Sequence, residues 1–242
     1  MKIIIIAGGL GTRISEETED KPKPMVLIND KPIIWHLMNI FSLQGFNEFI
    51  ISTGYKSEVI ENWVHSNEIV DSNSNVMHIA TLNTGLNTQT GGRISEVMKT
   101  IPGEKVIATY GDGLANISVQ KLLAFHDSHG KLATVTAVRP PARFGYMKIE
   151  NDAVTHFGEK NQSDEGWING GFFVLEPSVL NVITSPNEPF ESGALTHLAK
   201  VSQLMAYQHE GFWQPMDTLR EKRELEKYAS LPQPPWLKTT NP

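Results

Sequence analysis

A glycine-rich segment near the beginning of the chain, followed by an arginine and a lysine, has the residue types that bind phosphates. The segment Gly8–Arg13 reads GGLGTR, and Lys23 follows within the sequence KPKP at Lys21–Pro24. Glycines let backbone N–H groups approach a polyphosphate closely, while an arginine can donate two hydrogen bonds to it and a lysine adds a point charge. Taken one at a time, the first segment could also be a tight turn without a ligand, and the second a solvated basic loop.

The glycine spacing differs from that of two well-known phosphate-binding loops. A dinucleotide-binding loop needs three glycines in the pattern GxGxxG, and the third would fall at Ile14. A P-loop needs a lysine directly after its last glycine, and none follows here. The sequence therefore favours neither a Rossmann-type dehydrogenase nor a P-loop NTPase.

Two aspartates and two histidines could also take part in chemistry. Asp112 follows an apolar segment that we expect to form a strand, and α/β sheets bind ligands at the carboxyl ends of their strands. Asp112 could equally be a turn residue within Gly-Asp-Gly, and Asp217 could be the N-cap of a helix. His126 and His129 form an HxxH pair without an evident third ligand, so we expect exposed polar residues rather than a metal site.

The composition limits the kind of protein. The 242 residues contain no cysteine, which excludes disulfides and thiolate metal sites and makes a reducing cytoplasm the expected location. The formal net charge of −6 argues against nucleic acid as the main partner. No apolar run approaches the roughly 18 residues of a membrane span, and the short apolar beginning does not resemble a signal peptide. We expect a soluble intracellular protein whose partners are neither nucleic acids nor membranes.

The elements that must position these residues alternate between strand and helix in the first half of the chain. The apolar run Ile3–Ile6 is typical of a strand that is covered on both faces. Further strands are predicted at Asn47–Ser52, Lys105–Thr109 and Lys131–Val138, and helices at Pro32–Gln44, Ser57–Val64 and Ser118–Ser128. This alternation predicts an α/β, Rossmann-like domain with a mostly parallel central sheet and helices on both faces.

The second half of the chain has a different pattern. The short runs Phe144–Glu150, Ala153–Glu159 and Ile168–Leu175 leave little room for helices, and they predict a small antiparallel addition. Beyond them we expect helices at Pro177–Ile183 and Leu195–Val201, a strand at Leu204–Gln208 and a last helix from Asp217. Between the two halves, the polar segment Asn67–Gly92 is predicted to be a long loop with one strand at Val76–Leu82.

Several segments together resemble the sugar-1-phosphate nucleotidyltransferase family, and in particular its cytidylyltransferases. They are AGGLGTRISEET, KPKPMV, KPIIWH, TGGR, TYGDG, FGYMKI, INGGFFVLEPSV and GFWQPMDTLREK. Each segment alone would be a weak signal, but the combination is specific and extends from Met1 to about Trp236. The resemblance implies the nucleotide-diphospho-sugar transferase fold, as one domain over residues 1–242. Residues 1–143 would mainly bind the nucleotide, and residues 144–242 would mainly bind the acceptor in the antiparallel addition.

The implied reaction transfers CMP from CTP to glucose 1-phosphate and releases pyrophosphate, with Mg²⁺ as cofactor and without a covalent intermediate. The implied catalytic residues are Arg13, which neutralises the leaving phosphates, Lys23, which contacts the α-phosphate, and the Mg²⁺ ligands Asp112 and Asp217. The implied nucleotide-binding residues are Gly8, Gly9, Leu10, Gly11, Thr12, Arg13, Lys23, Thr88, Gly91, Gly92, Arg93 and Gly111. The implied acceptor-binding residues are Glu159, Lys160, Asn169, Gly170 and Gly171. We also expect a homo-oligomer.

The chain departs from the family pattern on the acceptor side. It has Glu191–Leu195 (ESGAL) where relatives have Glu-x-Glu-Pro-Leu, Glu159–Asn161 where they have Glu-Lys-Pro, and a shorter segment at Asn67–Asn87. Two alternatives therefore stay open. The acceptor could be another sugar 1-phosphate or a non-sugar phosphate, such as a phosphorylated amino acid or phosphocholine. The protein could also be a nucleotide-binding regulatory subunit without turnover, although all four implied catalytic residues are present.

Overall fold

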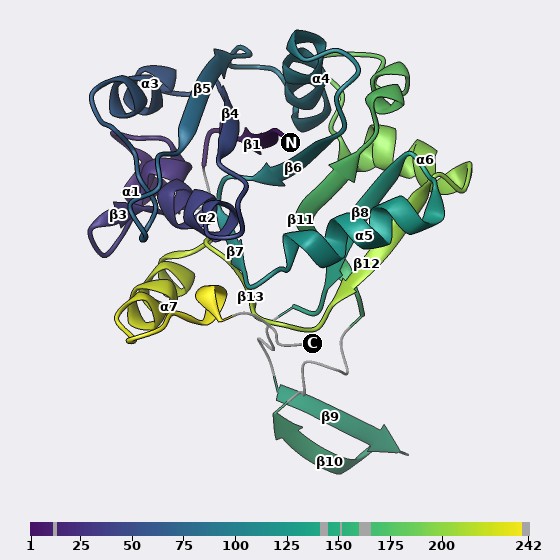
Figure 1. The fold of residues 1–242 in the computed structure, drawn as a ribbon. Helices are drawn as coiled ribbons and strands as arrows, with labels where there is room; N and C mark the ends of the chain where they lie inside the picture. Colours follow the sequence, from purple (N-terminus) through teal and green to yellow (C-terminus); the bar gives the residue numbers. More distant parts are fainter. Residues whose placement is uncertain (12–13, 141–144, 151, 160–165, 239–242) are drawn as a thin grey trace.

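The structure is a computed structural model that describes residues 1–11, 14–140, 145–150, 152–159 and 166–238. Its centre is a sheet of seven strands in the order β12-β8-β11-β6-β1-β4-β5 (Figure 1). In chain order these strands are β1 (Ile3–Ile6), β4 (Glu48–Thr53), β5 (His78–Asn83), β6 (Val106–Tyr110), β8 (Ala133–Val138), β11 (Ile168–Leu175) and β12 (Leu204–His209). The α/β fold with a mostly parallel central sheet is confirmed, and strand β5 confirms the strand predicted inside the polar segment.

Strand β11 is the exception to the parallel arrangement. It runs antiparallel to both of its neighbours, β6 and β8, whereas the other four strand pairs of the sheet are parallel. The expectation that Ile168–Leu175 belongs to the antiparallel addition is therefore wrong. The last six residues of β11 are buried, so this strand needs cover on both faces and is suited to the middle of the sheet. The addition consists of β9 (Gly145–Glu150) and β10 (Ala153–Glu159), which project from the rest of the molecule (Figure 1).

Strand β1 shows that both faces of the sheet are covered. All four of its isoleucines are buried, but they belong to different clusters. Ile3 and Ile5 pack in the cluster that contains residues of α2 (Ile33–Ser42), α3 (Ser57–His65), α5 (Val119–His129) and α7 (Leu219–Ala229). Ile4 and Ile6 pack in the cluster formed with α4 (Thr90–Thr100) and α6 (Thr196–Lys200). The alternation follows from the two-residue repeat of a strand.

The predicted helices are found, with changes at their ends. Pro177–Asn181 is a 3-10 helix, and a π-helical turn at Glu191–Leu195 leads directly into α6. Helix α4 has no counterpart among the predicted elements, and its first turn lies within the segment predicted to be a loop. Gly91 and Gly92 reduce its intrinsic helix propensity, but Ile94, Val97 and Met98 have helical spacing and are buried. Within the described residues, no helix has both the length and the apolar character needed to cross a membrane.

Candidate active site

A pocket of about 820 Å³ opens where β1 and β6 end, at the carboxyl edge of the parallel strands. Its lining combines residues from the glycine-rich segment, from the beginning of α4, from the end of β6, from the beginning of β11, and from the segment before α7. An α/β sheet is expected to bind its ligand at this edge, because strand order changes direction there and loops diverge. Most residues that the sequence singles out meet at this one place.

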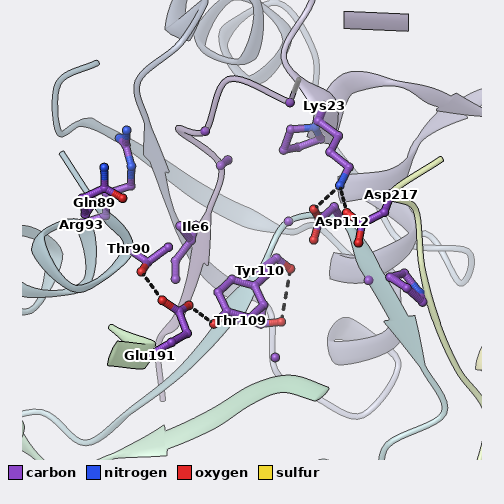
Figure 2. A pocket seen from close by; sticks show the side chains of 18 of the residues that line it. Ile6, Lys23, Gln89, Thr90, Arg93, Thr109, Tyr110, Asp112, Glu191 and Asp217 are labelled. Atoms are coloured by element: carbon purple, nitrogen blue, oxygen red, sulfur yellow. Dashed lines mark hydrogen bonds and ion pairs between the residues drawn. The ribbon is translucent and has the colours of Figure 1, made fainter. Parts of the chain in front are cut away.

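Three charged side chains form an ion cluster on one side of the pocket: Lys23, Asp112 and Asp217 (Figure 2). The Lys23 Nζ atom lies 2.7 Å from an oxygen of Asp112 and 2.7 Å from an oxygen of Asp217. These residues lie 89 and 194 positions from Lys23 in the chain. The sequence expectation that they face one pocket agrees with this geometry.

The two aspartates are brought together by a short pair of strands. Strand β7 (Gly113–Ala115) pairs with β13 (Trp213–Pro215) so that Gly113 lies opposite Pro215. The Met216 N–H then donates to the carbonyl of Asp112 at 2.9 Å, which places the two carboxylates at the same end of the ribbon. Asp112 is therefore held by β7–β13 pairing and is more than a turn residue.

Asp217 is not the N-cap of the last helix. That helix, α7, is capped by Thr218, whose hydroxyl accepts from the Glu221 N–H while the Glu221 carboxylate accepts from the Thr218 N–H. This is a complete capping box. The Asp217 carboxylate is thereby left to the pocket, where it contacts Lys23.

Lys23 is a buried residue rather than part of a solvated basic loop. It is only 8% exposed, has Pro22 directly before it and Pro24 directly after it in the chain, and begins a short 3-10 helix, Lys23–Met25. Burial lowers the pKa of Lys23, but the neighbouring Asp112 and Asp217 carboxylates outweigh that effect and hold the pKa above its usual value. The side chain is therefore a permanent positive charge in the pocket wall at neutral pH.

In the described part of the glycine-rich segment, some residues line the pocket and one bonds to the residues that support it. Gly9, Leu10 and Gly11 line the pocket. The Gly8 carbonyl instead accepts hydrogen bonds from the Tyr55 N–H at 3.2 Å and from the Arg93 Nη2 atom at 2.9 Å. Thr12 and Arg13, two of the residues implied to contact the triphosphate, lie outside the described residues.

Arg93 lines the pocket and also supports its wall. It is 3% exposed, and its guanidinium also donates to the Thr53 carbonyl at 2.9 Å and to the Thr84 hydroxyl at 2.6 Å. Burial lowers its pKa. Because the guanidinium bonds to the end of β4, to the segment after β5 and to the glycine-rich segment, it holds these three parts together. Its implied contact with a nucleotide stays a prediction.

Gly91 and Gly92 lie at the beginning of α4 against another segment of the protein. The Gly91 N–H donates to the Glu188 carbonyl at 3.0 Å, and a Cβ atom on Gly92 would overlap the carbonyl of Pro186. Their lack of a side chain lets the helix approach that segment closely. Thr88 and Gly111, by contrast, line the pocket directly.

The implied acceptor residues are only partly described. Asn169, Gly170 and Gly171 line the pocket at the beginning of β11, and the Trp213 indole donates to the Gly170 carbonyl at 2.9 Å. Glu159 is the last residue of β10, and its side chain lies outside the described part. Lys160 lies outside the described residues altogether.

A chain of hydrogen bonds on the other side of the pocket was not predicted by the sequence. We call it the polar chain; it consists of Thr90, Glu191, Tyr110 and Asn169, and Figure 2 labels the first three. Thr90 donates to Glu191 Oε2 at 2.8 Å, Tyr110 donates to Glu191 Oε1, and Asn169 donates to the Tyr110 hydroxyl at 3.2 Å. The sequence flagged Glu191 only as part of an unusual segment, and Tyr110 only as a neighbour of Asp112.

The histidine pair was predicted wrongly, because His126 is 1% exposed. The Lys131 N–H donates to His129 Nδ1 at 2.9 Å, so the His129 proton is on Nε2 and donates to the Thr134 hydroxyl at 2.8 Å. The Thr134 hydroxyl also forms a hydrogen bond with His126 Nδ1 at 2.8 Å, and His126 Nε2 donates to the Glu176 carboxylate at 3.2 Å. Both imidazoles therefore link α5, β8 and the end of β11 by hydrogen bonds.

The ion cluster is the place where a divalent cation would fit. Two carboxylates with hard oxygen donors suit Mg²⁺, which commonly takes one or two protein carboxylates together with substrate phosphates and water. In the described part of the chain, no group of three or more acidic, histidine or cysteine side chains could hold a metal. Asp112 and Asp217 would therefore need ligands from the substrate to complete the coordination.

Comparison with known proteins identifies relatives over nearly the full chain. The model of the nucleotidyl transferase family matches residues 2–217. The glucose-1-phosphate cytidylyltransferase of Salmonella typhi is 43% identical over 253 aligned positions, covering 98% of this chain and 98% of that protein. A probable glucose-1-phosphate cytidylyltransferase of Bacillus subtilis is 40% identical over 252 positions, covering 98% and 99%. The crystal structure of HddC from Yersinia pseudotuberculosis, complexed with GMP-PN, superposes with a TM-score of 0.71 at 26% identity, covering 93% and 98%.

Proposed function

The chain belongs to the nucleotidyl transferase family, and we propose that it transfers the CMP group of CTP to glucose 1-phosphate, forming CDP-glucose and pyrophosphate. The observation that carries the proposal is the ion cluster of Lys23, Asp112 and Asp217 at the carboxyl edge of the parallel strands. Relatives with 40–43% identity over the whole chain are named for this reaction, which supports the choice of base and acceptor.

In the proposed reaction, an oxygen of the acceptor phosphate attacks the α-phosphorus of CTP while the bond to pyrophosphate breaks. No protein atom needs to become covalently attached, so catalysis rests on positioning and on neutralising charge between two polyanions. Lys23 is proposed to contact the α-phosphate and to stabilise the charge that develops there. Its high pKa keeps the ammonium charged throughout the neutral range.

Asp112 and Asp217 are proposed to hold Mg²⁺. The ion would add positive charge where the phosphates meet. Both carboxylates are about one-third exposed or less, so they can accept a ligand from the pocket while β7, β13 and the capping box of α7 fix their backbones. Rigid placement of both carboxylates limits the loss of entropy when the substrates bind.

The remaining predicted contacts belong to the same proposal. Residues 1–143 are proposed to provide most of the nucleotide site, with Gly9 to Gly11 along the triphosphate and Thr88 near the base. Residues 144–242 are proposed to provide most of the acceptor site, including Asn169. Arg13 and Lys160 are proposed to neutralise the leaving and the acceptor phosphates. A homo-oligomer is proposed as the working assembly.

The experiment that tests the function measures pyrophosphate release with Mg²⁺ for four nucleoside triphosphates against a panel of small phosphates. We expect release with CTP and glucose 1-phosphate, and CDP-glucose as the product identified by mass spectrometry. Release with UTP or dTTP but not with CTP would contradict the base assignment. Release only with another sugar 1-phosphate, a phosphorylated amino acid or phosphocholine would contradict the acceptor assignment. No release with any pair would favour a regulatory subunit.

A further inference from the structure

The polar chain contains one carboxylate, that of Glu191. The carboxylates of the ion cluster pair with a lysine, whereas Glu191 accepts hydrogen bonds from hydroxyl groups. It lines the pocket and remains exposed to it, although both of its oxygens accept hydrogen bonds. The donors come from different elements, since Thr90 begins α4 and Tyr110 ends β6. A carboxylate has about four acceptor positions, so two remain for a ligand.

The orientation of this carboxylate is fixed by donors that are themselves oriented by further hydrogen bonds. The Thr90 hydroxyl accepts from the Phe190 N–H at 2.8 Å, so its own proton is directed at Glu191. Asn169 Oδ1 accepts from the Gly171 N–H at 2.8 Å, so its amide protons face the Tyr110 hydroxyl. Burial and the Glu191 charge raise the pKa of Tyr110, which keeps its hydroxyl protonated as a donor.

The backbone at Glu191 is also unusual. Glu191–Leu195 forms a π-helical turn, a rare conformation that is frequent at functional sites. The turn aims Glu191 at the pocket. The side-chain direction of Gly193, two residues later, points instead into the space filled by the Glu188 side chain. Gly193 stands where the family has a second glutamate, but a side chain there would not point into the pocket. The carboxylate that lines this side of the pocket is that of Glu191.

The charge of Glu191 limits what it can recognise. No cationic side chain of the described residues forms an ion pair with it, and its contacts are the two hydroxyls. An unpaired carboxylate repels phosphates but accepts strong hydrogen bonds from neutral hydroxyl groups. It lies across the pocket from Lys23, where a phosphate would be attracted (Figure 2).

We propose that Glu191 determines specificity by accepting a hydrogen bond from a sugar hydroxyl of a substrate. The proposal rests on the proposed function, which supplies two sources of such a hydroxyl: the ribose of the nucleotide and the sugar ring of the acceptor. Thr90 and Tyr110 act as positioning residues that hold the carboxylate toward that hydroxyl. Loss of the substrate hydroxyl should then weaken binding only while the Glu191 carboxylate is present, so the two changes should have coupled effects on affinity.

The test is a set of calorimetric titrations on the full-length protein. The probes are CTP with its 2′-deoxy and 3′-deoxy analogues, and glucose 1-phosphate with its monodeoxy analogues. We expect one deoxy analogue to bind about tenfold more weakly than its parent to the unchanged protein, as for a lost hydrogen bond to a charged group. In Glu191→Ala, parent and analogue should bind equally. A deoxynucleotide that shows this coupling identifies the ribose as the source, and a deoxy sugar phosphate identifies the acceptor.

Glu188→Ala is the matched control. It removes a carboxylate three residues away whose Oε2 atom is bonded to Thr184 outside the pocket, and it should leave the tenfold difference intact. Glu191→Gln keeps the shape of the side chain, and it takes the place of the alanine variant if that variant does not fold. Equal loss of affinity for all probes in both Glu191 variants, or no loss, would overturn the role of Glu191. Failure of the unchanged protein to bind either parent would overturn the proposed function and this inference together.

Discussion

The two sides of the pocket, the ion cluster and the polar chain, differ in their charge and in the groups that hold their carboxylates. The ion cluster brings a lysine between two aspartates at 2.7 Å, so the lysine offsets one of the two negative charges and the cluster keeps one net negative charge. The polar chain holds a single carboxylate with neutral hydroxyl and amide donors. The two carboxylates of the first arrangement suit a metal ion and its ammonium suits a phosphate, whereas the second arrangement suits neutral hydroxyls. Under the proposed function, this difference would let one cavity distinguish the two ends of a sugar phosphate.

The largest expected effect is on the ion cluster. Asp112→Asn should reduce turnover by on the order of 10³-fold, the upper range for losing one fixed electrostatic contact in an active site. Lys23 keeps Asp217 as a partner, so the fold should remain intact. Steady-state pyrophosphate release measures the loss, and calorimetry without metal should show that CTP binding largely survives. Loss of cooperative unfolding in this variant would instead mean that Asp112 is mainly structural.

Lys23→Met should reduce turnover by roughly 10²-fold and should also change metal binding by the free protein. The ammonium lies within hydrogen-bond distance of both carboxylates and competes with any cation there. Without it, Mn²⁺ should bind about tenfold more tightly, which corresponds to about 1.4 kcal/mol of competition. Electron paramagnetic resonance of free Mn²⁺ measures this without substrate.

The chain offers a matched control for the lysine. Lys222 also bridges two carboxylates, Glu17 at 2.9 Å and Glu226 at 3.2 Å, but outside the pocket lining. Lys222→Met should leave turnover unchanged. If it tightened Mn²⁺ binding as much as Lys23→Met does, the competition would be a general property of bridged carboxylates.

A smaller effect is expected from Tyr110→Phe on the polar chain. The change removes one donor to Glu191 and one acceptor for Asn169. Each such bond contributes about 0.5–1.5 kcal/mol, so the KM for one substrate should rise roughly two- to tenfold while kcat changes little. A drop in kcat with constant KM would place Tyr110 in the chemical step and would remove the contrast between the two sides.

The smallest expected effect is the pH dependence of stability, which arises from histidines outside the pocket lining. Burial lowers the pKa values of His36, His129 and His209, so the folded protein binds fewer protons than the unfolded chain below about pH 6.5. The free energy of unfolding should fall as the pH drops through that range, and His129→Asn should reduce the slope. Urea titrations between about pH 7.5 and pH 5.5 measure it. A slope of the opposite sign would contradict the lowered pKa values of these three histidines.

Sequence patterns predicted the ion cluster better than the polar chain. Lys23, Asp112 and Asp217 each belong to a segment with a family pattern, although only the β7–β13 pairing explains why the aspartates meet. The polar chain depends on the π-helical turn at Glu191 and on the exact beginning of α4, and neither has a recognisable local signal. The run Ile168–Leu175 was predicted to join the antiparallel addition, and it does run antiparallel to its neighbours, but those neighbours are β6 and β8 of the central sheet. The local pattern of a strand does not indicate which strands distant in the chain will pair with it.

Helix α4 and His126 show why local preference was misleading. The two glycines of α4 oppose a helix, yet close packing against the Ser185–Phe190 segment compensates for them. His126 is polar in sequence, but Thr134 and Glu176 satisfy both of its nitrogens in the interior. In both cases, residues distant in the chain supply what the local sequence lacks, and single-sequence reasoning has no access to them.

The hydrogen bonds to the Gly8 carbonyl have a consequence for the loop that follows it. Two donors, one of them the buried Arg93 guanidinium, fix the direction of that carbonyl. Because a trans peptide is planar, its N–H points the opposite way, so the Gly9 amide faces away from Arg93. The orientation of this donor is therefore settled when the protein folds. A ligand that accepts from it finds a preorganised amide and loses little affinity to ordering the loop.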